Sequence, residues 1–130
     1  MMTVDQIIQL CHSKYTYRKD NRNYGEERMD THESAVLAGE RWSDDCDGFA
    51  GTAATIAIME GYPRERVKLI ICKLKQNGEM HMVAGVDMEE TTLIMDCNFK
   101  RVYDFNRSKE YEWLYFQNMD EPGQWYRYTD

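Results

Sequence analysis

The stretch that most constrains the fold is the run of small and apolar residues between Phe49 and Ile58. At helical spacing these residues leave almost no polar face, and a helix of that kind is buried on most of its sides. Asp45 lies at the expected start of this helix, and Gly61 is a natural residue for its end. The sequence therefore predicts a buried helix over about residues 45–60, which the rest of the chain has to cover.

Segments that can cover this helix lie on both sides of it. Thr3 and Gln6 have the spacing of a capping box, which predicts a first helix through about Tyr15. A second, shorter helix should begin near Thr31 and end before Gly39. After residue 63 the apolar period changes from helical to alternating, which is typical of strands joined by short polar turns. The expected strands cover residues 67–74, 79–87, 91–98, 100–105, 110–117 and 124–129.

Helices followed by an antiparallel meander predict an α+β fold, in which the N-terminal helices pack on an antiparallel β-sheet. With 130 residues the chain should form one domain, residues 1–130. A net charge of −7 argues against a nucleic-acid partner. No apolar stretch is long enough for membrane insertion, and no secretory signal is visible, so we expect a cytoplasmic or virus-encoded protein. The four cysteines lack CxxC spacing, which is typical of reduced thiols.

Cys46 stands out because it lies between Asp45 and Asp47 in the first turn of the buried helix. Unpaired backbone N–H groups and the helix dipole favour a thiolate there, whereas the flanking carboxylates oppose its ionisation. With an imidazole nearby we expect the pKa of Cys46 to fall below about 7.5. Cys72, inside an apolar strand, should stay protonated. The acids are explained most simply as a helix N-cap at Asp44 or Asp45, and a favourable first-turn acid at Asp47.

A nucleophilic cysteine needs a base, and the base needs an orienting group. Strand alternation places His81 on one face of its strand and Asp96 on one face of the next. A hairpin centred between Met88 and Glu89 sets His81 directly opposite Asp96, within reach of a hydrogen bond. A loop of odd length would place the two side chains on opposite faces.

The remaining histidines offer less. His12, on the first helix, and His32, near a helix start, are both expected to face solvent. A metal site is a further alternative, but its candidate ligands lack recognisable zinc spacing; they are Cys46, Cys72, His81 and Cys97.

These motifs resemble those of the bacterial transglutaminase-like cysteine proteinases, a branch of the papain-like and transglutaminase-like superfamily. The family block of Gly-Asp-Cys, two acids, an aromatic residue and Ala corresponds to residues 44–50 (DDCDGFA). The family's His-x-Val strand corresponds to residues 81–83, and its Leu-Asp-Asn to residues 95–97. Upstream, the family's Tyr-x-x-Asp and Gly lead-in is similar to Tyr17, Asp20 and Tyr24-Gly25. The chain departs from the family at three positions, with Asp44 for Gly, Gly48 for the second acid and Cys97 for Asn.

The resemblance implies a papain-like/transglutaminase-like fold and a catalytic triad, with Cys46 as nucleophile, His81 as base and then acid, and Asp96 orienting His81. The reaction would be cleavage of a peptide-type bond in a protein or peptide substrate, through a thioester acyl-enzyme. This chemistry requires no cofactor. Some family members bind calcium through acids beside the nucleophile, which makes Asp45 and Asp47 calcium candidates. Two other functions remain open, namely transglutaminase-type transfer to an amine and a non-catalytic binding module on the same fold.

Overall fold

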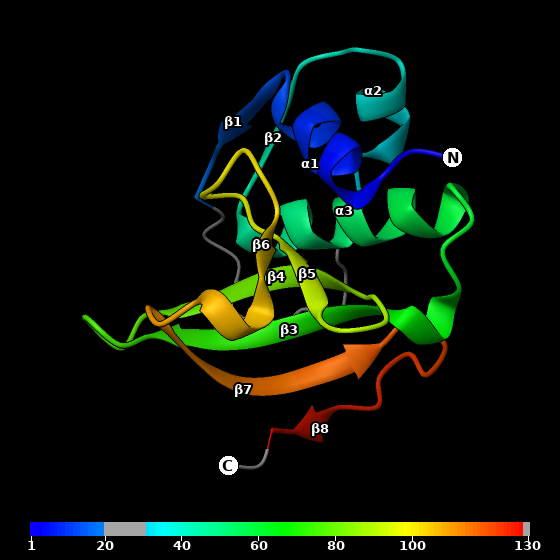
Figure 1. The fold of residues 1–130 in the computed structure, drawn as a ribbon. Coiled ribbons are helices and arrows are strands. Elements are labelled where there is room, and N and C mark those ends of the chain that lie inside the picture. Colours follow the sequence, from blue (N-terminus) through cyan, green and yellow to red (C-terminus); the bar gives the residue numbers. More distant parts are fainter. Residues whose placement is uncertain (20–30, 129–130) are drawn as a thin grey trace.

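The structure is a computed structural model that describes residues 1–19 and 31–128. Asp20 and Tyr24-Gly25 of the upstream motif therefore lie outside the described residues. In chain order the elements are α1 Val4–His12, β1 Tyr15–Tyr17, α2 Glu33–Leu37, β2 Trp42–Asp44, α3 Cys46–Met59, the 3-10 turn η1 Arg64–Arg66, β3 Val67–Leu74, β4 Met80–Asp87, β5 Thr92–Met95, β6 Tyr103–Asp104, the 3-10 turn η2 Phe105–Arg107, β7 Tyr111–Asn118 and β8 Tyr126–Arg127 (Figure 1).

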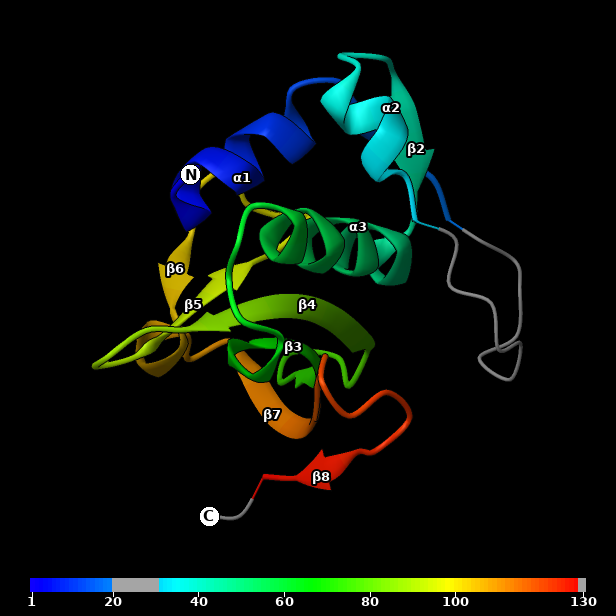
Figure 2. The same cartoon turned by 90° about the vertical axis from the view of Figure 1, so that its right-hand side faces the viewer.

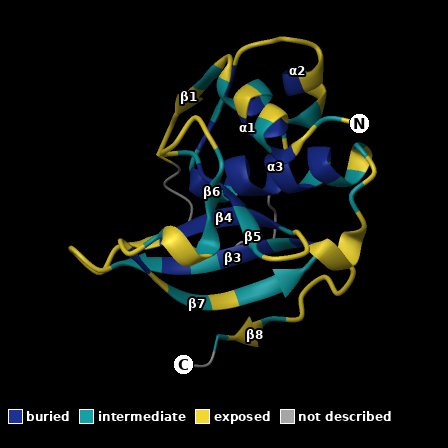
Figure 3. Cartoon of the chain, viewed as in Figure 1, coloured by how far each residue is buried: buried dark blue, intermediate teal, exposed yellow. Residues whose placement is uncertain are grey.

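Helix α3 forms the middle layer of the molecule, between α1 and the sheet (Figure 2). The Asp45 carboxylate caps it by accepting a hydrogen bond from the Gly48 N–H at 3.1 Å. Most of α3 is buried along its length (Figure 3), as its composition predicts. None of the described helices is long and apolar enough to cross a membrane. Four fully buried alanines allow α1 and the sheet to approach the helix closely: Ala50, Ala53, Ala54 and Ala57.

The sheet has six strands in the order β6-β5-β4-β3-β7-β8, and every pair is antiparallel. Strands β3 to β6 follow the predicted meander, but the meander is wrong for β7, which returns to pair with β3. The reason lies on the face of the sheet opposite α3, where Ile70, Val83 and Ile94 are fully buried. Without β7 and the segment that follows it, only side chains of β6 and η2 would shield this apolar face from water. Aromatic side chains cover it: Tyr103, Phe105, Trp113, Phe116 and Tyr128.

A small parallel sheet of β1 and β2, which the sequence pattern did not predict, leads into α3. Its anchor is Trp42, whose indole Nε1 donates to the carbonyl oxygen of Cys11 at 2.9 Å. The Trp42 ring also stacks on Phe49 of α3, with ring centroids 5.6 Å apart. These contacts hold β2 against both α1 and α3, and so fix the chain just before Cys46.

Candidate active site

His81 and Asp96 are hydrogen-bonded, with His81 Nε2 2.8 Å from Asp96 Oδ1. His81 is 7% exposed and Asp96 is fully buried. The expected contact is therefore present, but the expected register is wrong, because Asp87 pairs with Thr92. The turn spans residues 88–91 and is closed by a 2.7 Å hydrogen bond from the N–H of residue 88 to the carbonyl of residue 91. A shift of two residues keeps both side chains on one face, so His81 reaches Asp96 diagonally.

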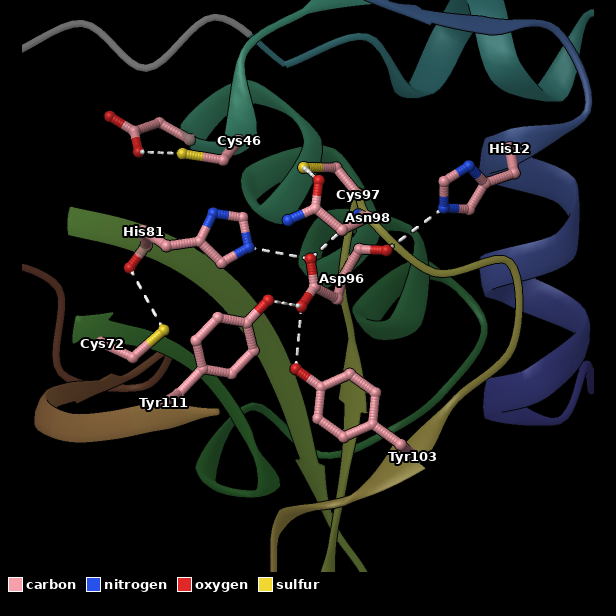
Figure 4. A network of polar contacts seen from close by, with 10 residues as sticks. His12, Cys46, Cys72, His81, Asp96, Cys97, Asn98, Tyr103 and Tyr111 are labelled. Atoms are coloured by element: carbon pink, nitrogen blue, oxygen red, sulfur yellow. Dashed lines mark hydrogen bonds and ion pairs between the residues drawn. The ribbon is translucent and has the colours of Figure 1, made fainter. Parts of the chain in front are cut away.

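Both oxygens of the Asp96 carboxylate are held by hydrogen-bond donors (Figure 4). The backbone N–H of Asn98 donates to Oδ1 at 3.0 Å. The hydroxyls of Tyr103 and Tyr111 donate to Oδ2 at 2.8 and 2.9 Å. Burial opposes ionisation of Asp96, but the bonds from His81, Asn98 and Tyr103 outweigh it and hold the pKa of this carboxyl below its usual value. Because the ionised carboxylate only accepts, His81 carries its proton on Nε2.

Tyr103 and Tyr111 were missed by the sequence reasoning. They come from β6 and β7, and the ring of Tyr111 also stacks on that of His81, at 5.4 Å between centroids and 23° between planes. A buried carboxylate has to find donors, and that requirement is the signal that could have pointed to tyrosines. The position of Tyr111 depends on the return of β7 beside β3, which the local pattern does not reveal.

Cys46 is the first residue of α3 and is 8% exposed. Its side chain faces the ring of His81 on the Nδ1 side, opposite the Nε2 that binds Asp96 (Figure 4). The thiol donates to Asp47 Oδ1, with 3.4 Å between the atoms. The structure thus brings together Cys46, His81 and Asp96 from α3, β4 and the end of β5.

The Cys46 thiol is neutral in this arrangement, because burial, followed by the charge of Asp47, raises its pKa. A backbone hydrogen bond from Met82 acts in the opposite direction but is weaker. The expected pKa below about 7.5 is therefore wrong for the resting site: burial and Asp47 outweigh the helix terminus. Burial also raises the pKa of Cys72, to about 12, so that thiol stays protonated as expected.

The other two histidines do not simply face solvent, contrary to expectation. His32 Nε2 lies 2.8 Å from Asp44 Oδ2, where it serves a carboxylate that is 9% exposed. His12 Nε2 lies 3.2 Å from the carbonyl oxygen of Asp96, and its ring centroid is 4.7 Å from that of Phe49. His32 therefore helps to hold Asp44, just before α3, and His12 helps to hold the backbone of Asp96.

Two departures from the family pattern, Asp44 and Gly48, are explained together. A Cβ at position 48 would lie 2.0 Å from Asp44 Oδ2, a distance that real contacts do not reach. Asp44 cannot easily move, because its Oδ1 accepts the N–H of Asp45 at 2.7 Å and its Oδ2 binds His32. The carboxylate at position 44 therefore requires glycine at position 48.

The calcium candidates Asp45 and Asp47 lie at the start of α3. Burial, together with the charges of Asp47 and Asp44, raises the pKa of Asp45, so negative charge is concentrated there. The capping role expected for Asp45 is confirmed. Within the described ranges, the one group of three metal-ligating side chains lies elsewhere, and it consists of His81, Asp96 and Cys97.

We predict that Asp44 and Gly48 are energetically coupled. Gly48→Ala should lower the free energy of unfolding by about 1–3 kcal/mol, the usual cost of overpacking. In an Asp44→Ala background the same change should be neutral or stabilising, because Ala favours a helix over Gly by about 1 kcal/mol. Urea unfolding of the four proteins measures the coupling. Equal effects of Gly48→Ala in the two backgrounds would contradict the steric account.

Comparisons with known proteins agree with this architecture. LapG of Legionella pneumophila in its calcium-bound form is similar with a TM-score of 0.69 and 15% identity, over 94% of this chain and 67% of that chain. EGTA-treated LapG gives a TM-score of 0.72 and 14% identity, over 98% of this chain and 66% of that chain. The chain therefore spans about two thirds of the length of LapG.

The sequence comparisons identify the family. A search of curated protein sequences finds no match. The sequence model of the bacterial transglutaminase-like cysteine proteinases, by contrast, matches residues 1–130, the whole chain. The chain belongs to the bacterial transglutaminase-like cysteine proteinase family.

Proposed function

We propose that Cys46, His81 and Asp96 are the catalytic triad of this cysteine proteinase. The observation that carries the proposal is the 2.8 Å hydrogen bond between His81 Nε2 and Asp96 Oδ1. It fixes the tautomer of His81 and leaves Nδ1 as the basic nitrogen on the side of Cys46 (Figure 4). Nucleophile, base and orienting group then stand in the order that covalent catalysis requires.

In the proposed reaction His81 Nδ1 takes the thiol proton while Cys46 Sγ attacks the carbonyl carbon of a peptide bond. The negative charge that develops on the carbonyl oxygen is stabilised by the backbone N–H of Cys46 at the start of α3. His81 then gives its proton to the leaving amine, and a thioester acyl-enzyme remains. A water molecule, deprotonated by His81, hydrolyses the thioester and restores the free thiol. The same acyl-enzyme would serve a transfer to an amine.

The contact between Cys46 and Asp47 adds a condition to this mechanism. At rest the thiol is neutral and donates to Asp47 Oδ1. It has to turn from Asp47 toward His81 before the proton can be transferred, so the charge on Asp47 opposes the first step. Proton transfer accordingly accompanies the attack, rather than preceding it as a stable thiolate–imidazolium pair.

The triad predicts that Asp96→Asn keeps the shape of the site but removes the charge that steadies imidazolium and favours the wrong tautomer. By comparison with other triads the turnover number should fall by a factor on the order of 10⁴. The turnover of dye-labelled casein by the two proteins measures the effect. Glu89→Gln, in the exposed β4–β5 turn, is the matched control and should cleave casein like the unaltered protein. An Asp96→Asn protein that is less stable but equally active would give Asp96 a structural role only.

We also propose that calcium binds at Asp45 and Asp47. Carboxylate oxygens are the ligands that calcium prefers. The charges of Asp44 and Asp47 repel that of Asp45, and a bound cation would offset this repulsion. LapG, which shares the fold, has been characterised in a calcium-bound form. In the described part of the chain, Asp45 and Asp47 belong to no group of three ligating side chains whose donor atoms lie within 4.8 Å of one another. The ion would contribute positive charge beside Cys46.

If calcium binds here, millimolar calcium should raise the melting temperature, because a ligand that binds only the folded state stabilises it. Asp47→Asn should abolish that rise, while the remote variant Glu89→Gln should keep it. Differential scanning calorimetry with and without calcium gives the shift. A melting temperature that calcium leaves unchanged in the parent protein would leave helix capping as the role of these acids.

A further inference from the structure

Cys97 is the third departure from the family pattern, and it lies beside the proposed triad. Metal-ligating atoms of His81, Asp96 and Cys97 all lie within 4.8 Å of one another. His81 and Asp96 are buried and Cys97 is half-buried. Residue 98, which follows, is exposed, so the cluster has one side near solvent. One nitrogen, one oxygen and one sulfur donor therefore converge at the end of β5.

This donor set suits zinc. Zinc binds cysteine sulfur at about 2.3 Å and histidine nitrogen or carboxylate oxygen at about 2.0–2.2 Å, with tetrahedral geometry that sets its donor atoms about 3.4–3.6 Å apart. His81 Nε2 and Asp96 Oδ1, at 2.8 Å, need only a small separation to admit the ion. Cys97 Sγ is 3.9 Å from Asn98 Oδ1 and also hydrogen-bonds to the Tyr15 side chain, and zinc would displace both of these contacts.

The surroundings of the cluster also resemble those of a metal centre. Metal-binding side chains are usually oriented by hydrogen bonds from an outer layer of residues. Here Tyr103 and Tyr111 hold Asp96 Oδ2, which leaves Oδ1 directed at His81. Three protein ligands and an open side leave the fourth zinc position to water, as in open zinc sites.

We propose that His81, Asp96 and Cys97 form an inhibitory zinc site that shuts off the proteinase. The inhibition rests on the proposed function of His81. Zinc takes the Nε2 lone pair, so the ring proton moves from Nε2 to Nδ1. Cys97 binds as thiolate and releases its proton to solvent, and the ion replaces the hydrogen bond between His81 and Asp96. With Nδ1 protonated, His81 can no longer accept the proton of Cys46.

Cys97 is the ligand that departs from the family pattern, because the Asn of that pattern offers no thiolate. Cys97 takes no part in the proposed acyl transfer. Cys97→Ser should therefore weaken zinc binding strongly while leaving the basal activity unchanged. Cys11→Ser is the matched control, since Cys11 is a fully buried thiol on α1 outside the cluster.

Metal binding is measured first without reference to activity, in the Cys46→Ala protein, which removes the neighbouring thiol. Cobalt(II) should bind with one ion per chain and give the near-ultraviolet thiolate-to-cobalt absorption, and zinc should displace it. Adding Cys97→Ser should abolish this absorption. It should also weaken zinc binding by at least about 100-fold, above the about 10–100-fold loss typical of outer residues. Adding Cys11→Ser instead should change neither.

Inhibition is measured second, with dye-labelled casein. Zinc should inhibit the parent protein and the Cys11→Ser variant, a zinc-selective chelator should restore both, and Cys97→Ser should resist zinc. The absence of a thiolate–cobalt band in Cys46→Ala, or a band that survives Cys97→Ser, overturns the site. Zinc that binds through Cys97 without inhibiting casein cleavage overturns its inhibitory role. Because the cobalt measurement needs no catalysis, failure of the zinc site is distinguishable from failure of the proposed triad.

Discussion

The rest of the structure depends on the hydrogen bonds to the carboxylate of Asp96, which is fully buried. An unpaired charge at such a position would cost several kcal/mol, so the fold has to bring donors to it. The donors come from β4, β6 and β7, through His81, Tyr103 and Tyr111. On the other side, His12 of α1 contacts the Asp96 backbone carbonyl. The sheet and α1 therefore both contact this one residue, and the hydrogen bond to its side chain fixes the orientation of His81.

Helix α3 supplies the second half of the site by a different physical means. It has no polar face, so the hydrophobic effect holds it between α1 and the sheet. Its start is fixed by the Asp45 cap and by Asp44, which occupies the space beside Gly48. Cys46, the first residue of α3, is therefore held on the Nδ1 side of the His81 ring (Figure 4). The same burial, with Asp47, keeps the thiol neutral at rest.

The parts that could be predicted from the sequence were those set by local periodicity. The bounds of β3 and the extent of α3 follow from apolar spacing. The contact between His81 and Asp96 was predicted although the predicted register was wrong. The register was shifted by two residues, and such a shift leaves each side chain on the same face of its strand. The return of β7, and with it Tyr111, depends on covering the far face of the sheet, which is a long-range requirement. The pKa of Cys46 was misjudged because the helix terminus and an imidazole were given more weight than burial and the charge of Asp47, although the sequence indicates both.

The central claim is that Cys46 is the nucleophile and that His81 activates it. The rate of alkylation of each thiol by iodoacetamide at pH 7, mapped by mass spectrometry, tests this claim most directly. The account predicts that Cys46 reacts before Cys97 and Cys11 despite its raised pKa, because His81 accepts its proton, and that His81→Ala removes this advantage. Faster modification of Cys97 or Cys11, or a Cys46 rate that is unchanged in His81→Ala, would contradict it.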